Sequence, residues 1–415
     1  MSDRLLTGCT RLVWQSRVQL PLPVNCQRLI AIARYWSSID GQRTATPPIN
    51  LYFVWEWWEE HFQRAEGRPE HIDLDWLDAT YLARQRFLYE RFGEFGLGQA
   101  DPVLDAAFVA RVMPFHTALL PVAMGMRVRV KQVGGYMWEP LPVESLQKLR
   151  PVDLAASPLG DLLLREKDQA LTRYGTVTQA VDVGSPANNA FMLRGAEFYA
   201  DLIADRDLAQ RYLDPITETI CLAYRFLTEH FGPMEGFPLG NCNVVMMSPA
   251  VYIDMIRDYD IRCISYAAEL NEQPPLTDVH HCDVRTEPFA EAYAGLPGIR
   301  SLQGSYHSNI ARIRSVLPGV SFSAMLSPVD LMNLPAAVID QEIDRCLAEG
   351  VRDFVIWNID PRCGPDQTTD LLRRLTRLAA RHNREAVISA IPFSWEEMDW
   401  EFPRYRDDFQ LPPGV

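Results

Sequence analysis

The segment Asp278-Val279-His280-His281-Cys282-Asp283 holds the side chains with the clearest chemical use in this sequence. His280 and Cys282 are two residues apart, so on a β-strand both side chains point to the same face. A third donor, Cys363, follows a predicted buried strand at residues 354–358. One imidazole and two thiolates suit Zn²⁺, and three protein ligands leave a fourth position open, as in catalytic zinc sites. We therefore predict that His280, Cys282 and Cys363 form a catalytic metal site.

These residues also have an ordinary interpretation. The chain has eight cysteines and eight histidines, so an H-x-C pair can arise by chance, and Cys363 could be a buried apolar side chain. The metal site gains support because all three residues lie at or just after the C-terminal ends of predicted strands, where a barrel builds its active site. The residues alone leave both interpretations open. Cys242 is not expected to be an additional ligand.

Strands and helices alternate over the last 240 residues. Short apolar strands with helices between them imply a parallel sheet that is covered by helices. The fold class is therefore α/β, and eight or nine strands fit a (β/α)8 TIM barrel of about 250 residues. An open doubly wound sheet is the alternative, but the sequence has no G-x-G-x-x-G or Walker motif. The predicted strands are 50–54, 127–133, 176–183, 243–247, 277–282, 299–303, 320–326, 354–358 and 386–391.

Polar and aromatic residues near the same strand ends are candidates for a supporting role. A histidine that binds a metal usually donates its other N–H to a carboxylate or carbonyl, so we expect a second layer of His281, Asp283 and Asp360 around the metal. Asp283 could instead cap a helix. The candidates for the substrate pocket are Trp55, Asn241, Asn243, Tyr306 and His307. A tryptophan-rich strand is more often part of a core.

Composition and charge restrict the class of protein. The chain has 415 residues, is 47% hydrophobic and has a net charge of −14, which argues against sequence-independent binding of nucleic acid. No window approaches 18 consecutive apolar residues, so no membrane span is predicted. The N-terminal 25 residues lack a continuous apolar stretch, and the cysteines show no clustered framework. We expect a cytoplasmic protein with free thiols.

About residues 175–380 resemble the uroporphyrinogen decarboxylase superfamily, in its zinc-dependent, corrinoid-linked methyltransferase branch. The matching features are the H-x-C…C-G pattern, Met246-Met247-Ser248-Pro249 with Tyr252, and the stretch 184–195. The resemblance implies a TIM barrel with zinc at its mouth, held by His280, Cys282 and Cys363. It also implies methyl transfer between a corrinoid and a thiol or O-methyl substrate.

The sequence departs from the family pattern in three respects. Asp283 stands where the family often has glycine after the H-x-C cysteine, and the Arg-rich N-terminal motif of the decarboxylase is missing. The segment at 278–283 begins like the D-x-H-x-x-G signature for corrinoids but lacks its glycine. We therefore expect cobalamin or another corrinoid to be free or carried by a separate protein. The alternatives are a metal-independent decarboxylase-like enzyme that acts on an acidic substrate, and a non-catalytic corrinoid-partner protein.

The chain is expected to have three parts. Residues 1–45 form a helical extension, and 46–394 form the barrel domain with helical insertions between its first strands. The extension and the start of the barrel domain are expected to be rich in helix and tryptophan. Residues 395–415 contain five aromatic residues and are expected to pack on the barrel. The expected partners are a small methyl donor or thiol acceptor and a corrinoid protein, and the chain could form a homodimer.

Overall fold

The computed structural model describes residues 48–62, 74–112, 115–130, 136–179, 181–282, 285–351 and 353–391. The chain divides into two units, residues 1–45 and 46–415, and every described residue lies in the second. The predicted extension 1–45 and the predicted aromatic tail 395–415 lie outside the described residues.

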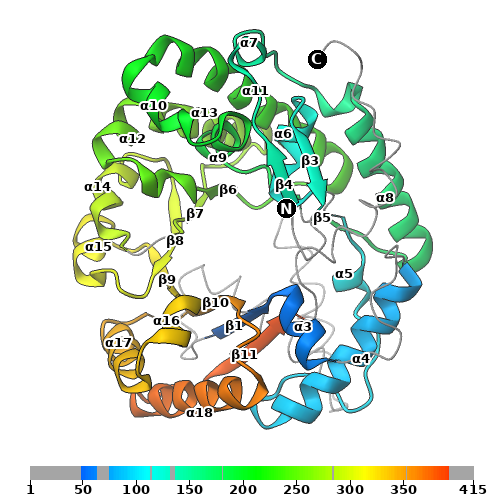
Figure 1. Ribbon diagram of the computed structural model, residues 1–415, viewed down its shortest axis with the longest axis vertical. Helices are drawn as coiled ribbons and strands as arrows, with labels where there is room; N and C mark the ends of the chain where they lie inside the picture. Colours follow the sequence, from blue (N-terminus) through cyan, green and yellow to red (C-terminus); the bar gives the residue numbers. More distant parts are fainter. Residues whose placement is uncertain are drawn as a thin grey trace. The chain divides into compact units, whose positions relative to one another are not determined.

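A seven-stranded parallel sheet forms the centre of this unit, with the strand order β11-β1-β10-β9-β8-β7-β6. Figure 1 shows its strands on the inside and the helices on the outside. Among the described residues, no pairing joins β6 to β11. The seven strands are β1 (Pro48–Phe53), β6 (Phe237–Gly240), β7 (Thr277–His280), β8 (Ile299–Ser305), β9 (Ser321–Leu326), β10 (Asp353–Ile359) and β11 (Val387–Ile391).

Four short strands lie outside this sheet. β2 (Arg111–Val112) pairs in parallel with β5 (Thr178–Gln179), and β3 (Arg127–Val130) pairs antiparallel with β4 (Tyr136–Glu139). The strand predicted at 127–133 is therefore one arm of a hairpin and not a strand of the central sheet.

Helices follow most of the strands, as a parallel sheet requires. No helix among the described residues is long and apolar enough to cross a membrane. The helices are α3 (Trp55–His61), α4 (Leu74–Phe92), α5 (Ala106–Val109), α6 (Leu119–Ala123), α7 (Val143–Leu146), α8 (Pro158–Tyr174), α9 (Pro186–Arg194), α10 (Glu197–Ala204), α11 (Arg206–Phe231), α12 (Pro249–Met255), α13 (Arg257–Leu270), α14 (Ala290–Tyr293), α15 (Ile310–Val316), α16 (Pro328–Asn333), α17 (Ala336–Ala348) and α18 (Pro365–Arg381).

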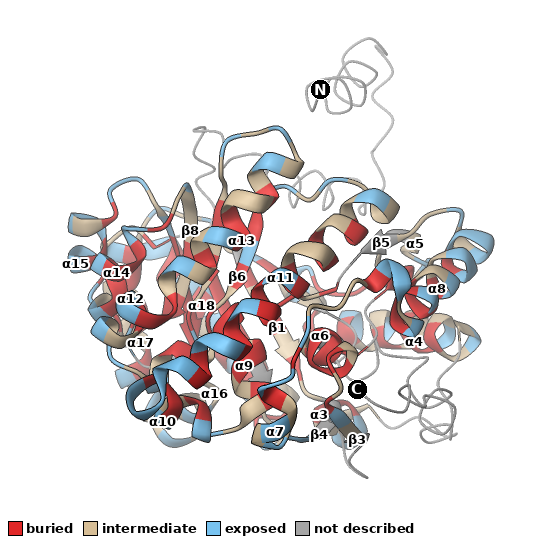
Figure 2. Cartoon of the chain, turned by 90° about the horizontal axis from the view of Figure 1, so that it is seen from above, coloured by how far each residue is buried: buried red, intermediate tan, exposed pale blue. Residues whose placement is uncertain are grey.

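The core lies between the strands and the inner faces of these helices. Figure 2 shows buried residues along the strands and exposed residues on the outer turns of the helices. In β9, five consecutive residues from Phe322 to Leu326 are buried, which is typical of a parallel strand that is covered on both faces. Trp57 and Trp58 are fully buried beside Phe53 and Phe92, so these tryptophans belong to the core.

One predicted strand is wrong in a way that matters for the site. Residues 243–247 do not form a strand, because Asn243–Met246 is a turn of 3-10 helix, and the strand lies earlier at Phe237–Gly240. The sequence pattern does not predict this strand, because Pro238 and Gly240 belong to residue types that are rare in strand interiors. Pro238 is tolerated because Phe237 and Asn241 donate the backbone bonds to the β7 side, to Leu276 and His280, while the nitrogen of Pro238 faces away.

Candidate metal centre

Strands β6 and β7 bring together three side chains that could bind a metal. In their parallel pairing, Gly240 lies opposite His280, the last residue of β7. Cys242 follows Gly240 by two residues and Cys282 follows His280 by two, so both cysteines leave the sheet at the same level. The two cysteines and His280 therefore meet at the C-terminal edge of the sheet, where barrels place their active sites.

The geometry of the three side chains fits a zinc ion. The ligand atoms of Cys242, His280 and Cys282 all lie within 4.8 Å of one another. Tetrahedral zinc with Zn–S bonds of about 2.3 Å separates its ligand atoms by about 3.8 Å, so small side-chain movements would close the site. Two thiolates and one imidazole leave the fourth position for a substrate, which is the catalytic pattern. Cys282 is exposed, whereas Cys242 and His280 are half-buried, so this open position can be reached from solvent.

Interactions within the cluster favour the thiolate form of Cys242. The contact with Cys282 holds the pKa of the Cys242 thiol well below its usual range, although burial acts in the opposite direction, and His280 lowers it further. Burial disfavours the charged form of His280, but Cys242, Gln303 and Asp182 outweigh it and raise the pKa of the imidazole. A thiolate is the form of cysteine that binds metals, so Cys242 is ready to act as a ligand at neutral pH.

Two neighbouring amides hold the cluster in place. His280 Nδ1 is hydrogen-bonded to Gln303 Oε1 of the adjacent strand β8, which leaves Nε2 as the nitrogen that could bind a metal. On the other side, Asn188 Oδ1 in α9 accepts bonds from the backbone N–H and the Nδ2 of Asn243, at 2.9 and 3.1 Å. Gln303, which is not one of the predicted second-layer residues His281, Asp283 and Asp360, thus contacts the His280 ring directly.

A buried polar network lies behind the ligands. Asp260 in α13 has no exposed surface, and its Oδ2 accepts bonds from Tyr252 Oη at 2.7 Å and Asn241 Nδ2 at 3.2 Å. Burial raises the pKa of Asp260 to about 7, while the bonds from Tyr252 and Asn241 lower it. His281 points to the opposite side of its strand from His280 and contacts Tyr293 Oη through Nδ1 at 2.7 Å. Asn241 adjoins Cys242, and His281 lies between His280 and Cys282, so the network holds the backbone of all three candidate ligands.

The structure does not bring Cys363 to this cluster. Strands β8 and β9 lie between β7 and β10, which Cys363 follows. The Cys363 side chain is buried, its Sγ lies 3.8 Å from Thr368 Oγ1, and its carbonyl accepts a bond from Trp57 Nε1 at 2.8 Å. Burial raises the pKa of this thiol, in contrast to that of Cys242. The geometry therefore favours Cys242 over Cys363 as the third candidate ligand, although Cys242 is not expected in this role from the sequence.

The predicted pocket residues are placed in two groups. Asn241 and Tyr306 are buried and hydrogen-bonded within the protein, Asn241 to Asp260 and Tyr306 to Asp330. Asn243 and His307 are only part-buried and stand at the C-terminal edge of the sheet, after β6 and β8. The side chain of Trp55, the first residue of α3, lies outside the described part of the chain.

The remaining predictions concern two carboxylates. Asp360 forms an ion pair with Arg362, with Oδ1 and Nε 2.8 Å apart, and this pairing holds the pKa of Asp360 below its ordinary value. Asp360 is thus engaged near Cys363 and not at the cluster of Cys242, His280 and Cys282. Asp283 lies outside the described residues.

Comparisons with known proteins place this architecture in a family. A solved structure of a methyltransferase from Methanosarcina mazei is similar in fold, with a TM-score of 0.54 and 17% identity over 84% of this chain and 98% of that chain. No curated protein matches the sequence. Residues 98–381, more than half of the chain, match the family described as Uroporphyrinogen decarboxylase (URO-D), a family of TIM barrels. The predicted (β/α)8 fold class is confirmed, and the chain belongs to the uroporphyrinogen decarboxylase family.

Proposed function

We propose that this protein is a zinc-dependent methyltransferase that moves a methyl group between a corrinoid and a thiol or O-methyl substrate. The observation that carries the proposal is the cluster of Cys242, His280 and Cys282 at the C-terminal edge of a parallel sheet. The similarity in fold to a methyltransferase supports the class of reaction. The corrinoid would be free or carried by a separate protein.

The donor set selects the metal and its task. Thiolates with one imidazole favour zinc over hard cations, which prefer oxygen ligands. When bound, zinc would act as a Lewis acid on a substrate thiol or on the oxygen of an O-methyl group. Gln303 orients the His280 ring. Because the pKa of the Cys242 thiol is low, its sulfur is deprotonated at neutral pH, and no proton competes with the metal for it.

The exposure of the site fits a reaction with two partners. Cys282 is exposed while Cys242 and His280 are half-buried, so one side of the cluster faces the protein and the other faces solvent. A substrate atom can reach the open side, and a methyl carrier can approach from the same side. Alignment of the two across this edge would supply the rate enhancement that positioning gives in group transfer.

The arginines do not favour the decarboxylase alternative. Recognition of an acidic tetrapyrrole requires cations that are available to its carboxylates. The four arginines near the matched motifs are each paired with a carboxylate of the protein: Arg194 with Asp201, Arg262 with Asp214, Arg285 with Glu287 and Arg362 with Asp360. They come from separate elements and do not form one anion-binding group.

The proposed function is tested by methyl transfer with purified, zinc-loaded protein. Methylcobalamin with simple thiols tests one direction, and cob(I)alamin with methoxylated aromatic compounds tests the other, each followed by the visible spectrum of the corrinoid. We expect turnover in at least one direction that is lost in Cys282→Ser. The matched control is Cys221→Ser, since Cys221 is a part-buried thiol in α11 and does not belong to the cluster of Cys242, His280 and Cys282. No turnover with thiols or methoxylated donors would contradict the proposal.

A further inference from the structure

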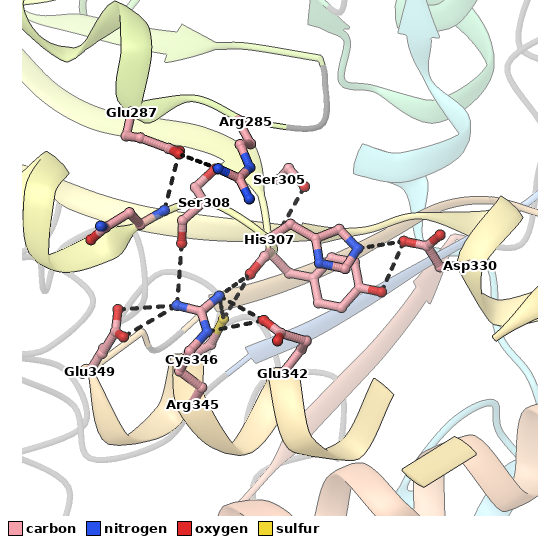
Figure 3. Close-up of polar contacts among 12 residues, drawn as sticks. Arg285, Glu287, Ser305, His307, Ser308, Asp330, Glu342, Arg345, Cys346 and Glu349 are labelled. Carbon is pink, nitrogen blue, oxygen red and sulfur yellow. Dashed lines mark hydrogen bonds and ion pairs between the residues drawn. The ribbon is translucent and has the colours of Figure 1, made fainter. Parts of the chain in front are cut away.

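A histidine and an aspartate meet at the ends of the next two strands of the sheet. His307 follows β8, Asp330 follows β9, and His307 Nε2 lies 2.7 Å from Asp330 Oδ2. Tyr306 Oη donates to the same carboxylate oxygen at 2.9 Å. Figure 3 shows the His307 ring and Asp330 facing each other, and both side chains are part-exposed, at 28% and 22%. The pair is therefore within reach of a substrate.

Hydrogen bonds from Arg345 hold the backbone on both sides of His307 in the sequence. Arg345 in α17 donates to the carbonyls of Tyr306 and Ser308, the two neighbours of His307, at 2.7 and 3.2 Å. Glu342 in the same helix and Glu349, the residue that follows it, form ion pairs with Arg345 (Figure 3). The backbone N–H of His307 also donates to Ser305 Oγ. An imidazole fixed in this way does not need to reorganise before it acts.

Strand β8 links this pair to the metal centre. Gln303, which holds His280, and Ser305, which holds the backbone of His307, are two residues apart and so lie on one face of β8. β7, β8 and β9 are neighbours in the parallel sheet, so the residues that follow them emerge at one edge. The His307–Asp330 pair and the cluster of Cys242, His280 and Cys282 thus follow neighbouring strands at the same C-terminal edge of the sheet.

We propose that His307, oriented by Asp330, is the general acid and base of the methyl-transfer site. This inference rests on the proposed function. Asp330 as a carboxylate fixes the proton of the ring on Nε2, which leaves Nδ1 with a lone pair that can exchange a proton. No described residue is bonded to His307 Nδ1.

The step is a proton transfer alone. When a thiol or alcohol is the acceptor, its S–H or O–H bond breaks, the electron pair stays on the heteroatom, and the proton forms an N–H bond at His307 Nδ1. In the opposite direction, that N–H bond breaks, its pair returns to the ring, and the leaving oxygen or sulfur gains the proton. No electron is gained or lost by the protein. Asp330 is a positioning residue, since it acts through the imidazole.

The test compares two histidine–aspartate pairs of this chain. His307→Gln keeps a hydrogen-bonding side chain but cannot carry the proton, and we expect turnover to fall by about 10²- to 10⁴-fold with unchanged zinc content. Imidazole added to His307→Gly should restore part of the activity. His382→Gln is the control, because His382 pairs with Asp344 at 3.0 Å beyond the end of α18, on another part of the surface. We expect its turnover to equal that of the wild type.

A second measurement does not depend on turnover. Nitrogen-15 NMR of the histidine rings, assigned through His307→Gln, should show the Nε2–H tautomer in the wild type and a mixture of tautomers in Asp330→Asn. Wild-type turnover in His307→Gln, loss of zinc from that variant, or an unchanged tautomer in Asp330→Asn would overturn the inference. A wild-type protein without methyl transfer would overturn the proposed function and this inference together, whereas an active His307→Gln would overturn the inference alone.

Discussion

The buried carboxyl of Asp260 makes a quantitative prediction about stability. It has no exposed surface and accepts only the bonds from Tyr252 and Asn241, and burial raises its pKa from 3.8 to about 7. The folded protein therefore holds this proton more tightly than the unfolded chain does. The contribution of Asp260 to the free energy of unfolding is complete below pH 3.8 and is lost as the pH rises through about 7.

The size of the effect follows from the displacement of the pKa. One pKa unit corresponds to about 1.4 kcal/mol, so the buried carboxyl costs roughly 4 kcal/mol at pH 8 and roughly 2 kcal/mol at pH 5. Asp260→Asn removes the titration, and its amide oxygen can accept the same two bonds. We expect the stability of this variant relative to the wild type to increase by about 2–3 kcal/mol between pH 5 and pH 8.

The assay is urea unfolding of both proteins at the two pH values in the presence of a chelator. The comparison of variant with wild type cancels the other titrating groups. Asp254→Asn is the matched control, because the side chain of Asp254 is 56% exposed and its ion pair with Arg206 lies in solvent. The same stability difference between Asp260→Asn and the wild type at pH 5 and pH 8 would refute the reasoning.

Three further predictions concern the site and the scaffold. Gln303→Leu removes the acceptor of His280 Nδ1 and should weaken zinc binding about 10- to 100-fold in a competition with a chromophoric chelator; unchanged affinity would show that Gln303 does not orient the ligand. Asp201→Ala leaves Arg194 and Tyr212 without their shared carboxylate and should cost about 3 kcal/mol in urea unfolding, against almost none for the exposed Asp214→Ala. Acidification should release zinc, since protons compete with the metal for all three donors. Metal analysis after dialysis at pH 5 checks this, and an unchanged zinc content would contradict the prediction.

The sequence was sufficient to predict the fold class because its signals are local. Short apolar runs such as those in β9 and β10 lie between turn residues and alternate with amphipathic helices such as α18. Buried parallel strands have this pattern, since helices cover both faces. The position of β6 could not be predicted in the same way, because Pro238 and Gly240 give it a weak strand signal.

The error in β6 explains why the site was only partly predicted. With a strand at 243–247, Cys242 precedes the strand and falls at the wrong edge of the sheet. With β6 at Phe237–Gly240, the same cysteine follows the strand, level with Cys282. Only the pairing of Gly240 with His280 puts Cys242 level with Cys282, so the sequence alone could not identify Cys242 as a neighbour of the H-x-C pair.

Pairings between distant segments were beyond the sequence. His307 was predicted as a pocket residue, but its partner Asp330 lies 23 residues later, and only the adjacency of β8 and β9 brings the two together. Likewise, the order of strands in the sheet decides that Cys363 leaves β10 apart from the β6–β7 edge. Spacing in one sequence does not contain this information.

The central claim is the identity of the metal ligands, and zinc stoichiometry in cysteine variants tests it most directly. Elemental analysis of freshly purified protein should find about one zinc per chain in the wild type and in Cys363→Ser, and almost none in Cys242→Ser or Cys282→Ser. Circular dichroism would show that each variant is folded. Retention of zinc by Cys242→Ser together with its loss from Cys363→Ser would contradict the ligand set of Cys242, His280 and Cys282.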